Sequence, residues 1–178
     1  MNILKKAFSF LSTLVLIAII GFLLIAAPLV AGYKPVMVLS GSMEPAFHVG
    51  SIIYYKQAPF ADINVGDPLT FYIEEGGAMV THRVIEKNEE TQEFTTQGDA
   101  NDTADPNPVA YSRVAGKATP FCIPYAGYYV SYGKQMPVIV LMGAILVMNM
   151  VIDSLYPDEK DKKSKKSKKQ QAEDKNQQ

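Results

Sequence analysis

The stretch Ser-Gly-Ser-Met-Glu-Pro at residues 40–45 contains the first candidate for chemistry, Ser42, and it follows a long apolar run. A serine hydroxyl is a weak nucleophile unless a neighbouring base takes its proton. Histidine suits that role because it titrates near neutral pH, and the chain has two histidines, His48 and His82. His48 is on the same tight segment as Ser42 and would reach its hydroxyl only with difficulty. His82 is therefore the stronger candidate for the base.

An acid must then orient the imidazole and stabilise its charged form. The loop Gly-Asp-Ala-Asn-Asp-Thr-Ala-Asp-Pro at residues 98–106 offers three carboxylates, those of Asp99, Asp102 and Asp105. On spacing alone, these carboxylates could instead cap a turn or bind a hard cation such as calcium. His82 could equally be a hydrogen-bonded surface histidine on a strand. The residues by themselves leave a catalytic triad, a metal-binding loop and ordinary turn chemistry open.

Residues 32–135 must position these side chains, and their pattern indicates one mainly β unit. Short β-branched and aromatic runs alternate with Gly, Pro and Asp turn signals, which is typical of a β sandwich or barrel. No long stretch of this region has helical periodicity. The expected strands are residues 36–39, 51–55, 69–73, 78–86 and 93–97. This arrangement places His82 in the middle of a strand and the three aspartates after the end of another.

Two apolar runs flank this unit. Residues 8–31 carry no charge over 24 residues, and about 20 are enough to cross a bilayer. A cleavable secretory signal would have a shorter apolar core and a small-x-small cleavage site, but Leu29 and Ile25 stand two before Ala31 and Ala27. An uncleaved anchor is expected. Residues 136–156 predict a second transmembrane helix near the short limit, with a buried core helix as the alternative.

Lysines at both ends predict the orientation of the two spans. Lys5 and Lys6 precede the first span, and the run from Lys160 to Lys169 follows the second. Basic flanks remain cytoplasmic, so residues 1–7 and 157–178 are expected in the cytoplasm. Residues 32–135 are expected on the outer side of the cell membrane. The tail, residues 157–178, is too polar to bury a core and is expected to be disordered. Its lysines are explained by topology and by anionic lipid, so nucleic-acid binding is not expected.

The composition of the chain limits the remaining function classes. The 17 basic and 18 acidic side chains nearly cancel, so net charge points to no partner. The single cysteine, Cys122, excludes an internal disulfide and a cysteine-based metal cluster. Its expected role is that of a small buried side chain.

Four blocks of sequence, in this order after an N-terminal anchor, resemble signal peptidase I of the ER type (the W-type branch shared by eukaryotes, archaea and some bacteria). The resemblance runs from Lys34 to about Ser112. The blocks are Ser40–Pro45, Val49–Ile53 with Gly66 and Asp67, Thr81–Val84, and Gly98–Asn101 with Asp105. The last block departs from the family at Ala100, where Asn is commoner. The resemblance implies a signal-peptidase/LexA-like β fold between two membrane helices.

The same resemblance implies roles for particular residues. Ser42 matches the nucleophile, and His82 stands where the common bacterial branch has a catalytic lysine. Asp105 matches the position expected to hold His82, with Asp99 as the second choice. Ser40 matches a position that can donate a hydroxyl to the oxyanion, alongside the backbone N–H of Ser42.

The function implied by the resemblance is removal of signal peptides from secretory precursors by a membrane-bound serine endopeptidase, with no cofactor and no metal. The expected partners are the precursor and the lipid bilayer. Three alternatives remain open from the residues. They are a two-span protein with a non-catalytic external β binding domain, a membrane serine protease that cuts itself or a regulator, and a metal-binding loop at residues 99–105.

Overall fold

The computed structural model describes residues 2–74 and 76–156. The lysine-rich tail that was expected to be disordered, residues 157–178, lies outside this description. The described residues divide into two compact units. One contains residues 22–133, and the other contains residues 2–21 together with residues 134–156.

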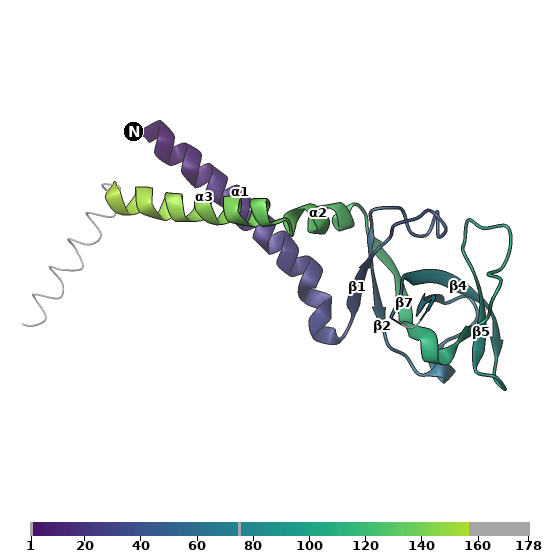
Figure 1. Cartoon of the computed structure of the whole chain (residues 1–178). Helices are drawn as coiled ribbons and strands as arrows, with labels where there is room; N and C mark the ends of the chain where they lie inside the picture. Colours follow the sequence, from purple (N-terminus) through teal and green to yellow (C-terminus); the bar gives the residue numbers. More distant parts are fainter. Residues whose placement is uncertain (1, 75, 157–178) are drawn as a thin grey trace, which may run out of the picture. The chain divides into compact units, whose positions relative to one another are not determined.

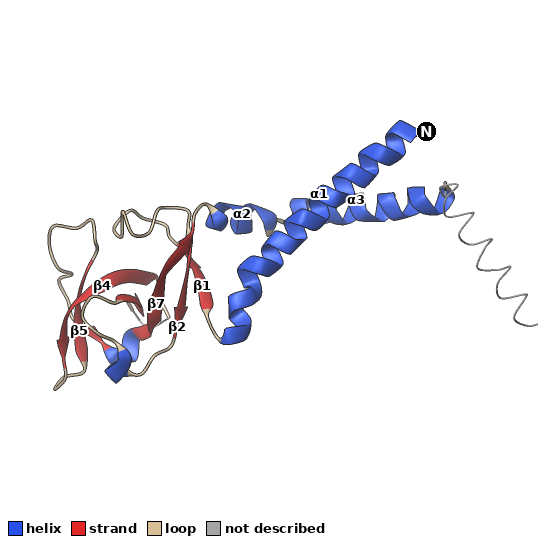
Figure 2. Ribbon diagram, turned by 180° about the vertical axis from the view of Figure 1, so that it is seen from behind, coloured by secondary structure: helices blue, strands red, loops and turns tan. Residues whose placement is uncertain are grey.

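The unit of residues 22–133 is built on one antiparallel sheet of seven strands, in the order β1-β2-β7-β3-β4-β5-β6 (Figures 1 and 2). The strands are β1 Lys34–Met37, β2 Ile52–Lys56, β3 Pro68–Tyr72, β4 Met79–Asn88, β5 Glu93–Gln97, β6 Val109–Ala110 and β7 Val114–Ile123. The sheet is curled, so that β4 bends over the strands that precede it (Figure 2). The prediction of a mainly β domain between two apolar helices is confirmed.

Two strands of the sheet were not predicted, and the longer of them, β7, lies in its interior between β2 and β3. Gly116 and Pro120 lower the β propensity of this segment, and both stand near irregularities in the ladder. The register shifts between Thr70 and Phe71 opposite Gly116, and a Cβ at Gly116 would lie 2.4 Å from the Lys56 carbonyl oxygen. The close approach of the Gly116 and Lys56 backbones therefore requires a glycine at this position. The same glycine lowers the β propensity of the segment, which is why the strand was not predicted from the sequence.

Buried apolar side chains form two clusters that hold the sheet and its loops together. One cluster lies between β3, β4 and β5 and comprises Ile63, Leu69, Phe71, Val84, Phe94 and Val109. The other joins β2 and β7 to the loop after β1 and comprises Met43, Phe47, Ile53, Tyr55 and Ala118. Burial of this kind contributes about 1.5–3 kcal/mol per large side chain. The loop after β1 is thus fixed by its own core residues.

The helices differ in length and environment. The long ones are α1, Asn2–Ala26, which continues into the short 3₁₀ helix η1, Ala27–Ala31, and α3, Met136–Leu155. Both are long and apolar enough to cross a membrane, and no residue along the described length of α3 is buried. A core helix would have a buried apolar face, so this exposed apolar surface does not fit the alternative interpretation of residues 136–156 as a core helix. The eight-residue helix α2, Ala126–Gly133, was not predicted.

Two further short 3₁₀ helices, η2 Phe60–Asp62 and η3 Tyr111–Arg113, lie in connections of the β unit. The Tyr111 hydroxyl donates to the carbonyl oxygen of Ala58 at 3.0 Å, so these two connections are joined to each other. They support the cluster around Phe94, because the Phe60 ring packs on Phe94 with centroids 4.9 Å apart.

Candidate active site

Ser42 lies on the loop between β1 and β2, and its position is set by buried neighbours. Met43, the next residue, is 2% exposed, and Phe47 is 1% exposed. The Phe47 N–H donates to the Met43 carbonyl at 2.8 Å, and the Glu44 N–H donates to the Gly41 carbonyl at 3.0 Å. The loop therefore turns tightly with two apolar anchors inside the domain, and it leaves Ser42 half-buried at the surface.

His82 lies in β4 and faces Ser42 from the sheet. Its backbone pairs with Leu69 of β3, and the residue is 8% exposed. The edge of its ring meets Phe71 with centroids 6.4 Å apart. Its Nε2 lies 3.1 Å from the Ser42 Oγ, which is hydrogen-bond distance for a base and the proton that it would take. Residues 40 positions apart are thus brought into contact.

Asp105 meets the other nitrogen of the same imidazole. Its Oδ2 lies 2.7 Å from His82 Nδ1, and its backbone N–H donates to the Thr96 carbonyl at 2.8 Å. An ionised carboxylate only accepts hydrogen bonds, so Nδ1 carries a proton and Nε2 is left as the acceptor for the serine hydroxyl. Ser42, His82 and Asp105 form one hydrogen-bonded chain with the tautomer that proton transfer from the serine requires.

Thr96 is a member of this arrangement that the sequence analysis missed. It is 0% exposed, and its hydroxyl donates to Asp105 Oδ2 at 2.6 Å, the oxygen that also accepts from His82. Thr96 lies in β5, in an inward-facing position of an alternating strand. The only signal in the sequence was this inward position of a polar residue two positions before the Gly-Asp block.

We expect Thr96→Val to lower activity and Thr96→Ser to retain most of it. Valine keeps the volume but removes a charge-assisted hydrogen bond, which is worth about 1.5–3 kcal/mol, so Asp105 would hold His82 less well. The readout is the kcat of the peptidase activity proposed below, together with the melting temperature of each variant. Equal kcat for valine and wild type would show that the hydroxyl only serves folding.

Asp99, the second choice for the acid, is engaged elsewhere. Its two oxygens accept from Arg83 Nε at 2.6 Å and from Arg83 Nη2 at 2.5 Å, and Arg83 Nη1 donates to the Gly66 carbonyl at 2.7 Å. The hydrogen bond from Arg83 to Asp99, and then their charge attraction, raises the pKa of Arg83 against the opposing effect of burial. Asp99 thus pairs with Arg83 and not with His82, so the geometry favours Asp105 as the acid that would orient His82. Asp99 ties β4 to the loop that carries Asp105.

The turn at residues 98–101 packs directly on the loop that carries Ser42. The Ala100 N–H donates to the Ser42 carbonyl at 2.9 Å, and a Cβ at Gly98 would lie 2.6 Å from the same oxygen. Only glycine permits this approach without displacing one of the loops. Ala100 takes part through its backbone, so the departure from the family pattern at this position leaves the contact intact.

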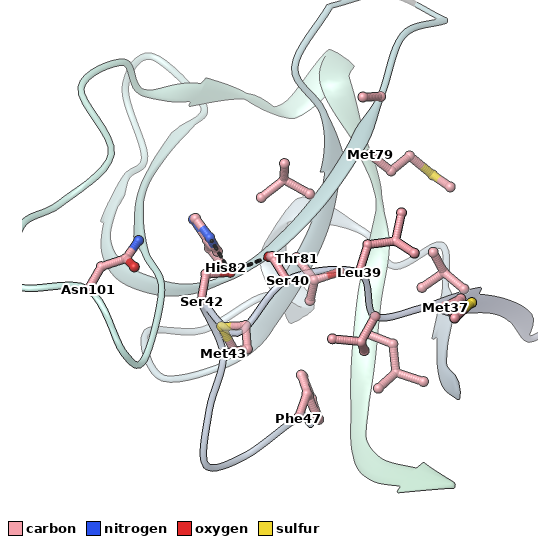
Figure 3. A pocket seen from close by; sticks show the side chains of 15 residues that line it. Met37, Leu39, Ser40, Ser42, Met43, Phe47, Met79, Thr81, His82 and Asn101 are labelled. Carbon is pink, nitrogen blue, oxygen red and sulfur yellow. Dashed lines mark hydrogen bonds between the residues drawn. The ribbon is translucent and has the colours of Figure 1, made fainter. Parts of the chain in front are cut away.

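Ser40 also lies close to Ser42. Its Oγ is 3.3 Å from the Oγ of Ser42, and both serines line the same groove (Figure 3). This hydroxyl could donate to Ser42 in the resting protein and to a substrate oxygen during reaction. His48, by contrast, faces Glu44, with Nδ1 3.8 Å from Oε1.

The groove beside Ser42 has a volume of about 450 Å³. The end of β1 and the residues after it form one wall, and the first half of β4 forms part of the lining. Figure 3 shows the apolar side chains of Met37, Leu39 and Met79 away from His82, with Asn101 on the opposite side of Ser42. The groove thus offers apolar surface on one side of Ser42 and the polar Asn101 side chain on the other.

A metal centre is not indicated by the described carboxylates and histidines. Within residues 2–74 and 76–156, no group of three or more His, Cys, Asp or Glu side chains is placed to hold a metal ion. Asp99 is paired with Arg83 and Asp105 with His82. The loop therefore uses two of its carboxylates for protein contacts.

Comparison with characterised sequences shows that the chain is similar to signal peptidases. It is 38% identical over 100 residues to signal peptidase I W of Bacillus subtilis (strain 168), which covers 54% of this chain and 52% of that protein. It is 31% identical over 128 residues to the signal peptidase complex catalytic subunit SEC11C of Rattus norvegicus, with 64% of this chain and 66% of the relative covered.

A third relative is covered more fully. The chain is 30% identical over 131 residues to the putative signal peptidase complex catalytic subunit SEC11B of Homo sapiens, and the match spans 65% of this chain and 78% of the relative. The chain thus spans about half the length of the bacterial relative and just under two thirds of the rat one. No family model matches the sequence.

Proposed function

Because this chain belongs to the ER-type (W-type) signal peptidase I family, we propose that it is a membrane-bound serine endopeptidase that removes signal peptides from secretory precursors. The observation that carries the proposal is the continuous hydrogen-bonded chain from Ser42 Oγ through His82 to Asp105. The three side chains come from a loop, a strand and a second loop. Ser42 and His82 line the same groove, and Asp105 holds the imidazole from behind, which supports a catalytic role over turn chemistry.

The reaction begins at Ser42. Its Oγ attacks the scissile carbonyl carbon while His82 Nε2 accepts the hydroxyl proton, and Asp105 stabilises the imidazolium that forms. The Ser40 hydroxyl and the Ser42 backbone N–H are proposed to donate to the developing oxyanion, and such a donor is typically worth about 3–4 kcal/mol. His82 then gives the proton to the leaving amine, and the carbonyl remains bound to Ser42 as an ester.

The second half of the reaction returns the enzyme to its starting state. Water attacks the ester carbonyl, His82 Nε2 takes a proton from that water, and the Ser42 Oγ leaves and regains the proton from His82. The specificity proposed from the family is for small residues at the positions one and three before the cut, which would lie along the apolar part of the groove. The products are the mature protein and the free signal peptide.

The proposed topology has two spans, residues 8–31 and 136–156, with residues 32–135 outside and both termini in the cytoplasm. Lys5 near the start of α1 and Asp153 near the end of α3 lie 3.7 Å apart, Nζ to Oδ1, which supports an antiparallel pair with both chain ends on one side. A precursor signal helix would share the bilayer with these spans. Confinement to one membrane raises the effective concentration of substrate without new contacts.

The test is cleavage of a secretory precursor by the purified full-length chain in lipid vesicles. The mature product should begin at the signal-peptide junction, as read by mass spectrometry, and a precursor with phenylalanine in place of the small residue before the cut should remain intact. The names of the mammalian relatives describe subunits of a complex, so use of the chain alone also measures whether partners are needed. Equal cleavage of both precursors would contradict the proposed specificity for a small residue before the cut.

A matched pair of variants distinguishes between the two candidate acids, Asp105 and Asp99. We expect Asp105→Asn to reduce kcat by about 10⁴-fold, because an amide that donates to Nδ1 leaves Nε2 protonated and unable to accept from Ser42. Asp99→Asn should retain far more activity and instead lower the melting temperature, because it weakens the bidentate contact with Arg83. A larger kcat loss in Asp99→Asn than in Asp105→Asn would reverse the assignment.

A further inference from the structure

Helix α2 is fastened on one side to the β unit. The Gly127 N–H donates to the Gly50 carbonyl at 2.9 Å, and a Cβ at Gly50 would lie 2.1 Å from the Tyr128 ring. Ala126, at the start of the helix, is 6% exposed. The helix therefore has a fixed place on the end of the sheet near the β1–β2 loop.

The same helix also packs on the last residues of α1, which belong to the same compact unit. The Phe22 and Tyr129 rings stack with centroids 4.5 Å apart, and a Cβ at Gly133 would lie 2.0 Å from Phe22 Cζ. The Tyr54 hydroxyl donates to the Ile25 carbonyl at 2.7 Å, which fixes the end of α1 on the sheet. The point where α1 joins the β unit is thus the point where α2 ends.

Chain connectivity brings the second apolar helix to the same point. Only Lys134 and Gln135 separate α2 from Met136, the first residue of α3, and three residue steps reach at most about 11 Å. Both apolar helices therefore join the β unit within about a nanometre of Gly133. If these helices span a bilayer, its outer surface passes beside α2 at the level of Phe22 and Ile25, so the apolar residues after Ile25 lie in the headgroup region and not in the hydrocarbon core.

Three tyrosines on this segment remain open to solvent. Tyr128 and Tyr132 stand four residues apart, on one face of α2, and Tyr125 lies in the turn before it. Their exposed fractions are 42%, 64% and 74% for Tyr128, Tyr132 and Tyr125. We call these three residues the tyrosine cluster. Tyrosine combines an apolar ring with a polar hydroxyl and is enriched where membrane and water meet.

We propose that α2 lies in the headgroup region of the bilayer, with the tyrosine cluster inserted among the lipids, and so fixes the height of the β unit above the membrane. The inference rests on the proposed two-span topology. The occupant is lipid because the junctions of both apolar helices meet beside α2. A constant height keeps Ser42 at a set distance from the bilayer, which would select where along a membrane-held precursor the cut falls.

The sequence allows a direct test, because the chain has no tryptophan. Tyr132→Trp and Tyr125→Trp each create a single reporter. Leu16→Trp, near the middle of α1 and 50% exposed, is the control inside the bilayer, and Glu90→Trp in the β4–β5 turn is the control in water. The full-length variants are placed in phosphatidylcholine–phosphatidylglycerol vesicles whose acyl chains carry bromine either near the headgroup or near the tail. Bromine quenches tryptophan only at close range.

Tryptophan at positions 132 and 125 should lose most of its emission with bromine near the headgroup and much less with bromine near the tail. The position 16 reporter should show the reverse, and the position 90 reporter should be quenched by neither. Unquenched emission at 132 with strong quenching at 16 would overturn the proposal while leaving the spans in place. Blue-shifted but unquenched emission at 132 would show a protein contact instead and would equally overturn it.

The peptidase proposal is judged separately in the same vesicles. Ser42→Ala, introduced beside Tyr132→Trp, should leave the quenching pattern unchanged even though cleavage is lost, because the nucleophile does not contact α2. Absence of cleavage with the expected quenching would reject the enzyme and keep the membrane contact. Cleavage without quenching of the reporters at positions 132 and 125 would keep the enzyme and reject the membrane contact.

Discussion

Ser42→Ala should abolish cleavage of a secretory precursor, with kcat lower by about 10⁶-fold. The physical reason is that the Ser42 Oγ is the atom expected to form the acyl bond, and no other hydroxyl lies at 3.1 Å from His82 Nε2 among the contacts of the described residues. The measurement is single-turnover cleavage in vesicles, with mature product quantified by mass spectrometry. Because alanine removes one oxygen from a half-buried side chain, the melting temperature should change little.

Ser40→Ala is the matched control for this variant. It removes a hydroxyl of the same kind two residues away, 3.3 Å from the Ser42 Oγ, and we expect a loss on the order of 10²-fold if Ser40 assists the oxyanion. The ranking of the two variants is therefore informative. A larger loss of activity in Ser40→Ala than in Ser42→Ala would assign the nucleophile to Ser40. Full activity in Ser42→Ala would favour a non-catalytic external domain.

His82→Ala should cause a loss close to that of Ser42→Ala, because the serine hydroxyl needs a base to become a nucleophile. The double variant Ser42→Ala/His82→Ala should be no worse than either single variant, since residues that act as a unit are strongly non-additive. Rates are compared at one pH and one lipid composition. Additive losses would show that the two side chains act independently.

Two further histidine variants sharpen this result. His48→Ala should retain wild-type cleavage, because His48 lies beside Glu44 and outside the hydrogen-bonded chain. His82→Lys should remain inactive near neutral pH, since Asp105 would favour the charged ammonium, which cannot accept a proton. Activity in His82→Lys comparable to wild type would show that this site tolerates an amine base, and loss of activity in His48→Ala would point to a second role for that loop.

Thr96 and the Arg83–Asp99 pair show how the site is supported beyond its reacting atoms. Thr96 reaches Asp105 from the buried face of β5, while Arg83 is adjacent to His82 in β4 and holds the start of the Asp105 loop through Asp99. The side chains of neighbouring strand residues point to opposite faces, so β4 presents His82 to the groove and Arg83 to the loop. One strand thus positions both the base and the segment that carries its acid.

Features that depend on local chemistry could be predicted from the order of the residues alone. The two apolar helices follow from the length and continuity of their apolar runs, which need no partner to be recognised. The strand at residues 93–97 was predicted with the bounds that β5 has, because its alternation and the Gly-Asp turn after it are local signals. Ser42 and His82 were singled out by residue type within short blocks, and their catalytic roles stay predictions.

Which side chains meet in the site could be read only from the folded chain. Asp99 and Asp105 lie six residues apart on one turn-rich loop, and the path of that loop sends one to Arg83 and the other to His82. β7 is recognisable only through its partners β2 and β3, because its glycine and proline contradict strand propensity and are tolerated at irregular ladder positions. Thr96 and the packing of α2 on Phe22 likewise depend on contacts between distant segments. Such contacts depend on the path of the whole backbone, which no short window of sequence contains.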